Sequence, residues 1–333
     1  MQSATAAPRL STYLTDFPAV AEPDAFGPLA VFPLIGPVPT LEYLSFAQAR
    51  ACGASVIELQ EGASVRDLVI ENPGDLPVLL FEGEKVLGAL QDRTFDVSVL
   101  VPPRSKLQVP VSCVEAGRWE GSRHAETFTP APQAAYPSLR RMKSTQVRSQ
   151  LEMPAEPRAD QGAVWAEVSA KSARHGAASR TDAMNDLFEH QRERLDEMCS
   201  AMSMKCSQTG MLVAIGGRFA VLDRVSQPDV LESLFAPLVR GYALDALEAP
   251  PADPPDIDAA RAMLERILAC RVTEYDGIGL GRDARVADGG VSGAGVLVAN
   301  ELVQLSVFTE NTGGDGTFAP LAGRIRRPSR RRA

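Results

Sequence analysis

The sequence predicts an α+β fold in which strands from both ends of the chain build a mixed or antiparallel sheet around a helical middle segment. Short alternating runs that are typical of strands fill residues 29–113 and 272–308, whereas helical patterns dominate residues 163–270. The chain has 333 residues, of which 45% are hydrophobic and 23% charged, and this composition is ordinary for a globular protein with a sizeable core.

The N-terminal part begins with residues 1–27, which are rich in Ala, Pro and Thr, show no sustained period and are expected to be flexible. A strand is expected over residues 29–35. Thr40 is a suitable N-cap for a short helix that ends before Gly53. Further strands are expected around residues 55–60, 65–71 and 77–81.

The most informative segment, residues 83–119, reads GEKVLGALQDRTFDVSVLVPPRSKLQVPVSCVEAGRW. Alternate residues are apolar from Phe95 to Val101 and again from Leu107 to Cys113, and side chains alternate between the two faces of a strand. This pattern predicts a hairpin of two strands that turns at residues 102–105.

Two registers fit the rule that both apolar faces point into one core. In one register Arg93 faces Glu115, and in the other Arg93 faces Cys113 while Gln91 faces Glu115. Both registers gather these four side chains on the inward face, at the end away from the turn. A buried charge needs a partner. We therefore expect an ion pair between Arg93 and Glu115, or a ligand that both contact.

After this segment we expect a long loop over residues 121–162, because these residues are dense in Pro, Ser, Arg and Ala. Helices are expected at 163–173 and 181–203, where a Met-rich stripe indicates core. Two strands are expected to be joined by a tight turn at Gly216-Gly217. Helices then begin at Pro228 and at Asp256 or Asp258, and Gly-punctuated strands fill residues 272–308.

The five cysteines are scattered without a C-x-x-C, and the three histidines lie far apart, so neither a disulfide framework nor a metal site is expected. No run suits a membrane span or a secretory signal. We expect a cytoplasmic protein that needs no cofactor.

The C-terminal residues 311–333 are expected to be a flexible tail, and residues 324–333 carry six arginines although the net charge of the chain is −8. Contact with nucleic acid or an acidic partner is one interpretation of this tail. A solvated, disordered end is the other.

The motifs GE-x-V-x-GA-x-Q-x-R and VSCVE-x-GRW within residues 83–119 resemble the ARPP family, the ARG and rhodanese-phosphatase-superfamily-associated proteins, where ARG denotes ADP-ribosylglycohydrolases. The resemblance covers roughly residues 25–310 and implies one domain over residues 28–310. It also implies that the protein binds or processes an ADP-ribose-like, NAD-derived or other phosphorylated small molecule. The chain departs from the family pattern at Leu90, Ala116 and Gln304.

The candidate catalytic residues belong to a hydrolase-like enzyme. Cys113 would be its nucleophile, and Glu115 would be the base or the orienting group. The alternative for Cys113 is a small buried hydrophobe. Arginine suits bidentate contact with phosphate, and tryptophan can stack on a base, although both types also serve in structural pairs and cores. The ligand-binding candidates are Gln91, Arg93, Ser112, Arg118, Trp119 and Glu84.

Three hypotheses follow for the function. The polar cluster binds or processes a phosphorylated small molecule, or it is the active site of a hydrolase. In the third, the chain is a non-catalytic interaction protein and the cluster is a structural ion-pair network.

Overall fold

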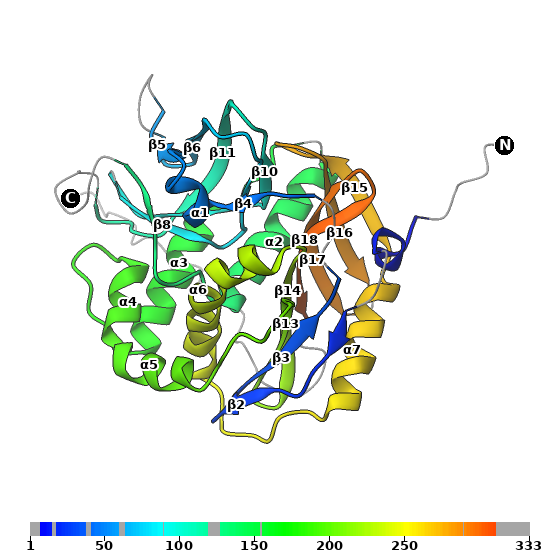
Figure 1. Ribbon diagram of the computed structural model, residues 1–333. Coiled ribbons are helices and arrows are strands. Elements are labelled where there is room, and N and C mark those ends of the chain that lie inside the picture. Colours follow the sequence, from blue (N-terminus) through cyan, green and yellow to red (C-terminus); the bar gives the residue numbers. More distant parts are fainter. Residues whose placement is uncertain are drawn as a thin grey trace, which may run out of the picture.

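The computed structural model describes residues 7–14, 18–37, 41–59, 64–88, 90–118, 127–153, 155–288 and 290–310 of the chain. These described residues form an α+β fold with a helical middle segment, as predicted. They build a nine-stranded sheet, a six-stranded sheet and a three-stranded sheet (Figure 1).

The large sheet joins both ends of the chain, because N-terminal β3 pairs with β13 and C-terminal β18 pairs with β14. Its order is β1-β3-β13-β14-β18-β17-β16-β15, with β2 paired to β3. Gly216 and Gly217, both at positive φ, form the tight turn predicted between β13 and β14. The strands are β1 (Ala19–Val20), β2 (Asp24–Phe26), β3 (Leu29–Ile35), β13 (Gln208–Ile215), β14 (Arg218–Val225), β15 (Val272–Asp276), β16 (Arg282–Asp288), β17 (Val291–Val298) and β18 (Glu301–Thr309).

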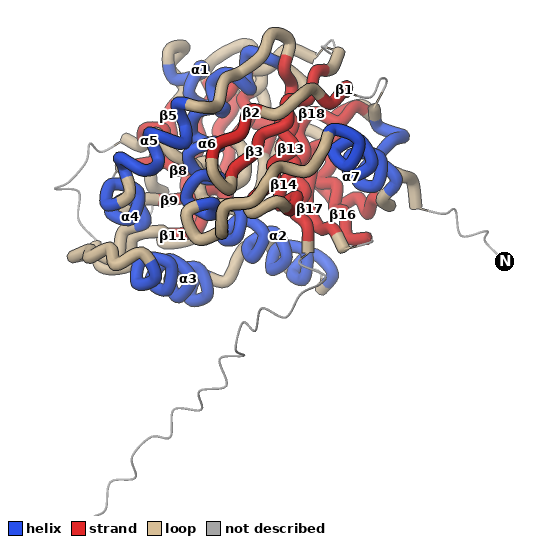
Figure 2. The backbone as a smooth tube through the Cα atoms, turned by 90° about the horizontal axis from the view of Figure 1, so that it is seen from below, coloured by secondary structure: helices blue, strands red, loops and turns tan. Residues whose placement is uncertain are grey.

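Helices cover both faces of the large sheet, with α7 (Ile257–Ala269) on one face and α6 (Pro228–Ala246) on the other (Figures 1 and 2). Successive side chains of β14 pack into the cores on opposite faces of the sheet, since Val221 packs on the α6 side and Leu222 on the α7 side. Asp256 caps α7 by accepting a hydrogen bond from the backbone N–H of Ala259, which confirms that predicted start.

Two smaller sheets lie together beside the large one (Figure 1). Their orders are β12-β8-β9-β11-β6-β5 and β10-β7-β4. The strands are β4 (Leu44–Ser45), β5 (Ser55–Ile57), β6 (Asp67–Asn72), β7 (Val78–Leu80), β8 (Lys85–Leu87), β9 (Arg93–Phe95), β10 (Val99–Val101), β11 (Ser105–Cys113) and β12 (Thr129–Pro130).

The remaining helices differ from the prediction in two ways. Ser45 caps α1 in a capping box with Gln48, whereas the expected cap, Thr40, lies outside the described residues. The single helix expected over residues 181–203 is two helices that meet at Gln191. These elements are η1 (Leu10–Tyr13), α1 (Phe46–Arg50), α2 (Pro137–Glu152), α3 (Gln161–Arg174), α4 (Met184–His190) and α5 (Arg192–Ser200).

The predicted long loop over residues 121–162 is wrong, because 16 of its residues form helix α2. The buried face of α2 carries Arg140 and Lys143, both with 0% exposure, next to Leu139 and Val147. Charged residues therefore stand where an apolar stripe is expected, and the helical period is hidden from a hydrophobicity pattern. The predicted flexible stretch over residues 1–27 likewise includes η1, β1 and β2 in its described part.

The predicted continuous hairpin is also corrected, because β9 and β10 belong to different sheets. β9 pairs with β11, whereas β10 pairs with β7. The chain leaves the first sheet at Asp96, whose buried carboxylate forms an ion pair with Lys143 of α2 at 3.1 Å.

Arg140 of α2 joins the small sheets to the large one. Its guanidinium contacts Glu82 Oε1 at 2.8 Å and forms a bidentate pair with Asp223 of β14, at 2.8 Å and 2.7 Å. Asp223 also accepts a hydrogen bond from Tyr242 of α6. Gly83 adjoins this network at φ +82°, and a Cβ there would lie 2.6 Å from Arg140 Cδ. A side chain at position 83 is therefore excluded.

Replacing Arg140 with Met should lower the free energy of unfolding by about 3–5 kcal/mol, because two buried carboxylates lose their counter-charge. Chemical denaturation at neutral pH measures this loss. Arg148→Met is the matched control on the same helix, since Arg148 pairs with exposed Glu152 at 3.6 Å. The control should lose no more than about 1 kcal/mol, and a loss as small in the Arg140 variant would contradict the prediction.

Candidate functional site

The register of β9 and β11 brings the predicted residues together. Arg93 is the cross-strand partner of Cys113, which is the second of the two registers the sequence allows. Gln91 Nε2 donates to the carbonyl of Glu115 at 2.9 Å. All four side chains are buried and meet where β9 begins and β11 ends. We call this group, together with Glu58, Lys85, Asp92 and Arg118, the β9–β11 cluster.

The ion pairs of the cluster differ from the expected one. Arg118 Nη2 contacts Glu115 Oε2 at 2.8 Å, and Arg93 Nη2 lies 3.8 Å from Glu58 Oε1. The predicted pair of Arg93 with Glu115 is therefore replaced by two others among the described residues. Glu58 follows edge strand β5, and its side chain is 16% exposed whereas that of Arg93 is fully buried.

A third pair in the cluster joins Lys85 of β8 to Asp92 at 3.2 Å, with both side chains buried. Lys85 Nζ also donates to Asn185 of α4 at 3.1 Å, and Gln133 donates to the same amide oxygen at 2.7 Å. None of these residues is among the site candidates predicted from the sequence. Lys85 and Asp92 both lie within the GEKVLGALQDR motif, which was the available signal, but Asn185 comes from a distant helix.

The Glu115 carboxylate is fully engaged by neighbouring donors. Oε1 accepts a hydrogen bond from the Thr181 hydroxyl at 2.9 Å, and Oε2 accepts one from the Asp92 N–H at 3.2 Å in addition to the Arg118 contact. Burial alone would raise the pKa of Glu115, but Arg118 and Thr181 hold that pKa below its usual value. At neutral pH Glu115 is therefore an ionised acceptor.

Cys113 lies at the centre of the cluster with its side chain buried. Cys113 Sγ is 3.2 Å from Gln91 Oε1. The backbone N–H of Cys113 donates to the side-chain amide oxygen of Gln161, and the Cys113 carbonyl accepts from the amide nitrogen, each at 2.8 Å. Burial raises the pKa of the Cys113 thiol more than the nearby Arg93 guanidinium lowers it. The thiol is thus protonated at rest, and the thiolate is the nucleophilic form.

The other predicted site residues lie elsewhere. Ser112 points to the opposite face of β11 and donates to Asp96 at 2.6 Å. Glu84 is buried in the turn before β8, where it accepts a hydrogen bond from the Phe81 N–H at 3.3 Å. Gln304, one of the positions where the chain departs from the family pattern, donates a hydrogen bond to Ser306 beside Arg140, away from the cluster. Trp119 lies outside the described residues.

Five ionisable groups of the β9–β11 cluster have shifted pKa values, and shifted groups also occur outside it, as in the network around Arg140. Burial raises the pKa of Glu58 and lowers the pKa of Lys85 and of Arg93, in addition to the shifts at Cys113 and Glu115. Concentrations of shifted ionisable groups are typical of functional sites, although structural ion-pair networks also produce them.

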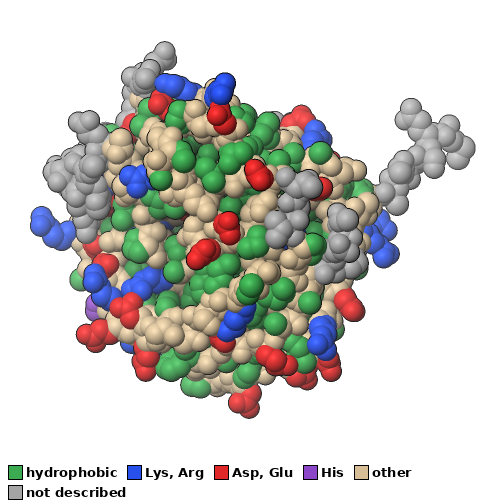
Figure 3. Space-filling model, in the orientation of Figure 1, with side chains coloured by type: hydrophobic (Ala, Val, Ile, Leu, Met, Phe, Trp, Pro, Cys, Tyr) green, Lys and Arg blue, Asp and Glu red, His purple; other side chains and the backbone are tan. Residues whose placement is uncertain are grey.

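The described part of the chain contains no group of three His, Cys, Asp or Glu side chains arranged to hold a metal ion. Within that same part, every helix is too short or too polar to cross a bilayer. Acidic and basic side chains are interspersed over the face seen in Figure 3, with apolar side chains between them.

Comparison with known proteins gives one match. A family model described as the ARG and Rhodanese-Phosphatase-superfamily-associated Protein domain, ARPP-1, matches residues 18–308. The chain belongs to the ARPP-1 family. The ARPP-1 match spans all three sheets and the whole β9–β11 cluster. The searches of curated proteins and of solved structures gave no match.

The buried carboxyl of Glu84 should make the stability of this ARPP-1 protein depend on pH. Burial raises the pKa of Glu84 from 4.5 to about 7. The folded state therefore binds this proton more tightly than the unfolded state, and the contribution to stability is lost as pH rises through about 4.5–7.

The measurement is the difference in free energy of unfolding between wild type and Glu84→Gln, which mimics the protonated acid. Relative to the Glu84→Gln variant, the free energy of unfolding of the wild type should fall by about 2–3 kcal/mol between about pH 5 and about pH 8. The control Glu152→Gln, at the exposed end of α2, should give a nearly constant difference. A flat profile for Glu84→Gln would show that its carboxyl titrates normally.

Proposed function

We propose that the β9–β11 cluster binds the anionic group of a phosphorylated small molecule, of the ADP-ribose-like or NAD-derived class. The observation that carries this proposal is the loose pair of Arg93 and Glu58. Their 3.8 Å separation exceeds the roughly 2.7–2.9 Å of a good charge-assisted hydrogen bond. A phosphate that reached Arg93 would displace Glu58 at small cost.

The state of Glu58 supports this exchange. Burial raises the pKa of Glu58, and its side chain is the most exposed of the three carboxylates in the cluster. A carboxylate that is poorly solvated and distant from its partner is the easiest of the three to displace. Arg93 would then offer a planar guanidinium for bidentate contact with phosphate oxygens.

A binding role fits the cluster better than covalent catalysis does. Glu115 already accepts hydrogen bonds at both oxygens, and the Cys113 thiol is protonated at rest. The roles of Glu115 as base and Cys113 as nucleophile stay predictions. Activation of Cys113 would require a bound ligand to change the charge around it.

The alternative is a structural ion-pair network in a non-catalytic interaction protein. One observation favours it: each of the three cations of the cluster already pairs with a carboxylate, and Arg118 contacts two of them, Glu115 at 2.8 Å and Asp92 at 3.6 Å. Such a network requires no ligand, and truncating one partner would cost stability alone.

Thermal unfolding with ADP-ribose, NAD, nucleotides and sugar phosphates tests the proposal. A binder at a concentration of about 100 times its Kd should stabilise the chain by about 2.7 kcal/mol. Arg93→Lys, which keeps the charge but loses the planar fork, should weaken binding about 10-fold or more. Glu58→Gln should bind at least as tightly as wild type, because the competing carboxylate is gone.

Arg104→Lys and Asp75→Asn are matched controls, since these residues form an exposed ion pair. Neither should alter affinity. Failure of every compound to stabilise wild type, or wild-type affinity in Arg93→Lys, would reject the binding role. Loss of stability in Glu115→Gln without any ligand effect would support the structural network.

A further inference from the structure

Arg224 of β14 is a buried cation without a carboxylate partner. Eight basic side chains are buried among the described residues, and seven of them form an ion pair with a carboxylate: Lys85, Arg93, Arg118, Arg140, Lys143, Lys171 and Arg285. The eighth, Arg224, is 5% exposed and has no carboxylate oxygen of those residues within 4.0 Å. Because a buried charge without a counter-charge is costly, this position favours an anion.

The guanidinium of Arg224 makes one hydrogen bond within the described part of the chain. Nη1 donates to the Leu302 carbonyl at 2.9 Å, whereas Nε is buried and has no partner there. The Nε/Nη2 edge of a guanidinium is a fork that matches the two oxygens of a carboxylate. Arg285 uses this edge in the same sheet, since its Nε and Nη2 donate to the two oxygens of Asp283, each at 2.6 Å. The same edge of Arg224 makes no such contact with the described residues.

The ionisable neighbour of Arg224 does not neutralise it. This neighbour is the Tyr43 phenol, which already bonds to Ser226 Oγ at 2.9 Å and to the Val303 carbonyl at 3.2 Å. Burial raises the pKa of Tyr43, so the phenol is neutral near pH 7. Burial lowers the pKa of Arg224, which shows the cost of a charge that its surroundings leave unbalanced.

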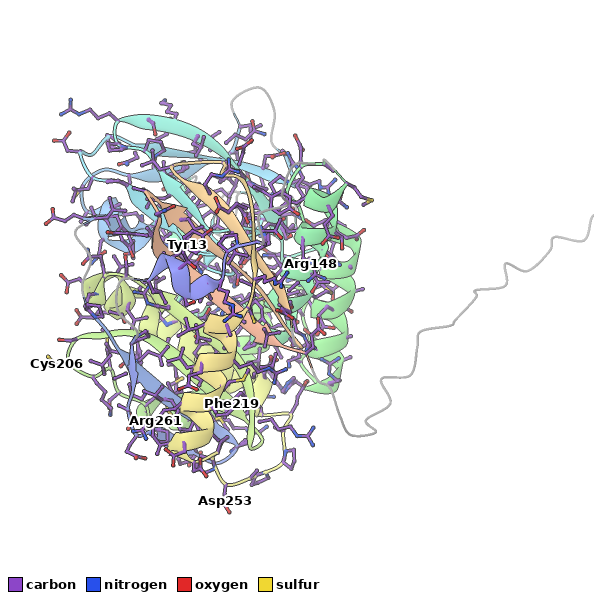
Figure 4. All side chains as sticks on the ribbon, turned by 90° about the vertical axis from the view of Figure 1, so that its right-hand side faces the viewer. Tyr13, Arg148, Cys206, Phe219, Asp253 and Arg261 are labelled. Carbon is purple, nitrogen blue, oxygen red and sulfur yellow. The ribbon has the colours of Figure 1, made fainter. Side chains whose placement is uncertain are left out.

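The fold makes space for Arg224 on the face of the sheet where α7 and η1 lie. Arg224 shares this face with Leu222, two residues earlier in β14. Figure 4 looks onto the same side and shows Arg261 on α7 and Tyr13 on η1. The cross-strand partner of Arg224 in β13 is Gly210, where a Cβ would lie 3.1 Å from Arg224 Cβ. A side chain at position 210 would therefore crowd the arginine.

Arg224 extends toward an exposed turn at the end of the sheet. Its cross-strand partner in β18 is Leu305, but Nη1 bonds to Leu302, three residues nearer to the start of that strand. β18 begins at Glu301, directly after the exposed residues 299–300. A small molecule can therefore approach the guanidinium from this end of the sheet.

We propose that Arg224 binds the carboxylate group of a small organic acid through its Nε/Nη2 edge. The single negative charge of a carboxylate balances one guanidinium, whereas a dianionic phosphate would leave a negative charge unpaired at a buried position. The site lies in a different sheet from the β9–β11 cluster and does not depend on the function proposed for that cluster.

Thermal unfolding of the full chain tests this proposal, with about 0.1 M sodium acetate in place of sodium chloride at constant pH and ionic strength. If acetate is present at about ten times its Kd, the Tm of the wild type should rise by about 2 °C relative to chloride. Inorganic phosphate at the same ionic strength should raise the Tm less. Arg224→Met should abolish the acetate effect, because it keeps an apolar stem of similar length and removes the fork.

Arg224→Lys is the second variant, since it keeps the charge but loses the fork, and it should bind acetate about 10-fold more weakly or worse. Arg104→Met is the matched control, because it removes an exposed cation, and it should respond to acetate as wild type does. Arg93→Lys should also respond normally. An acetate response in Arg224→Met equal to that of wild type, or no response of wild type at about 0.1 M acetate, would overturn the proposal.

Discussion

The interior of this protein depends on a single buried guanidinium. Arg140 compensates Glu82 from the turn beside the small sheets and Asp223 from the large sheet, and neither carboxylate is tolerable in a dry core without it. Its bonds fix where the small sheets lie on the large one. They also set the turn at Gly83, from which the chain runs into β8 and then to the β9–β11 cluster.

The sequence predicts what strand geometry alone determines. The alternation of side chains along a strand correctly places Arg93, Cys113, Gln91 and Glu115 on one face. This alternation does not determine how far a long side chain reaches. The pairing of Arg93 with Glu58, which comes from a separate strand segment, therefore had no local signal.

The failures share one physical cause, which is charge in the core. Helix α2 was missed because Arg140 and Lys143 occupy its buried face. The hairpin was extended too far because Asp96 looks like a solvent-facing residue, yet it is buried against Lys143. Hydrophobic periodicity finds elements that bury apolar side chains, and it fails where opposite charges are buried against each other.

The order of strands in the large sheet constrains how the chain folds. β3 lies near the N-terminus, but its partner β13 is separated from it by the small sheets and five α-helices, and β18 joins only at the end. The sheet cannot assemble progressively during synthesis, since its early strand must wait for partners made much later. We expect slow folding through long-range contacts, with the edge of β3 open to wrong partners in the meantime.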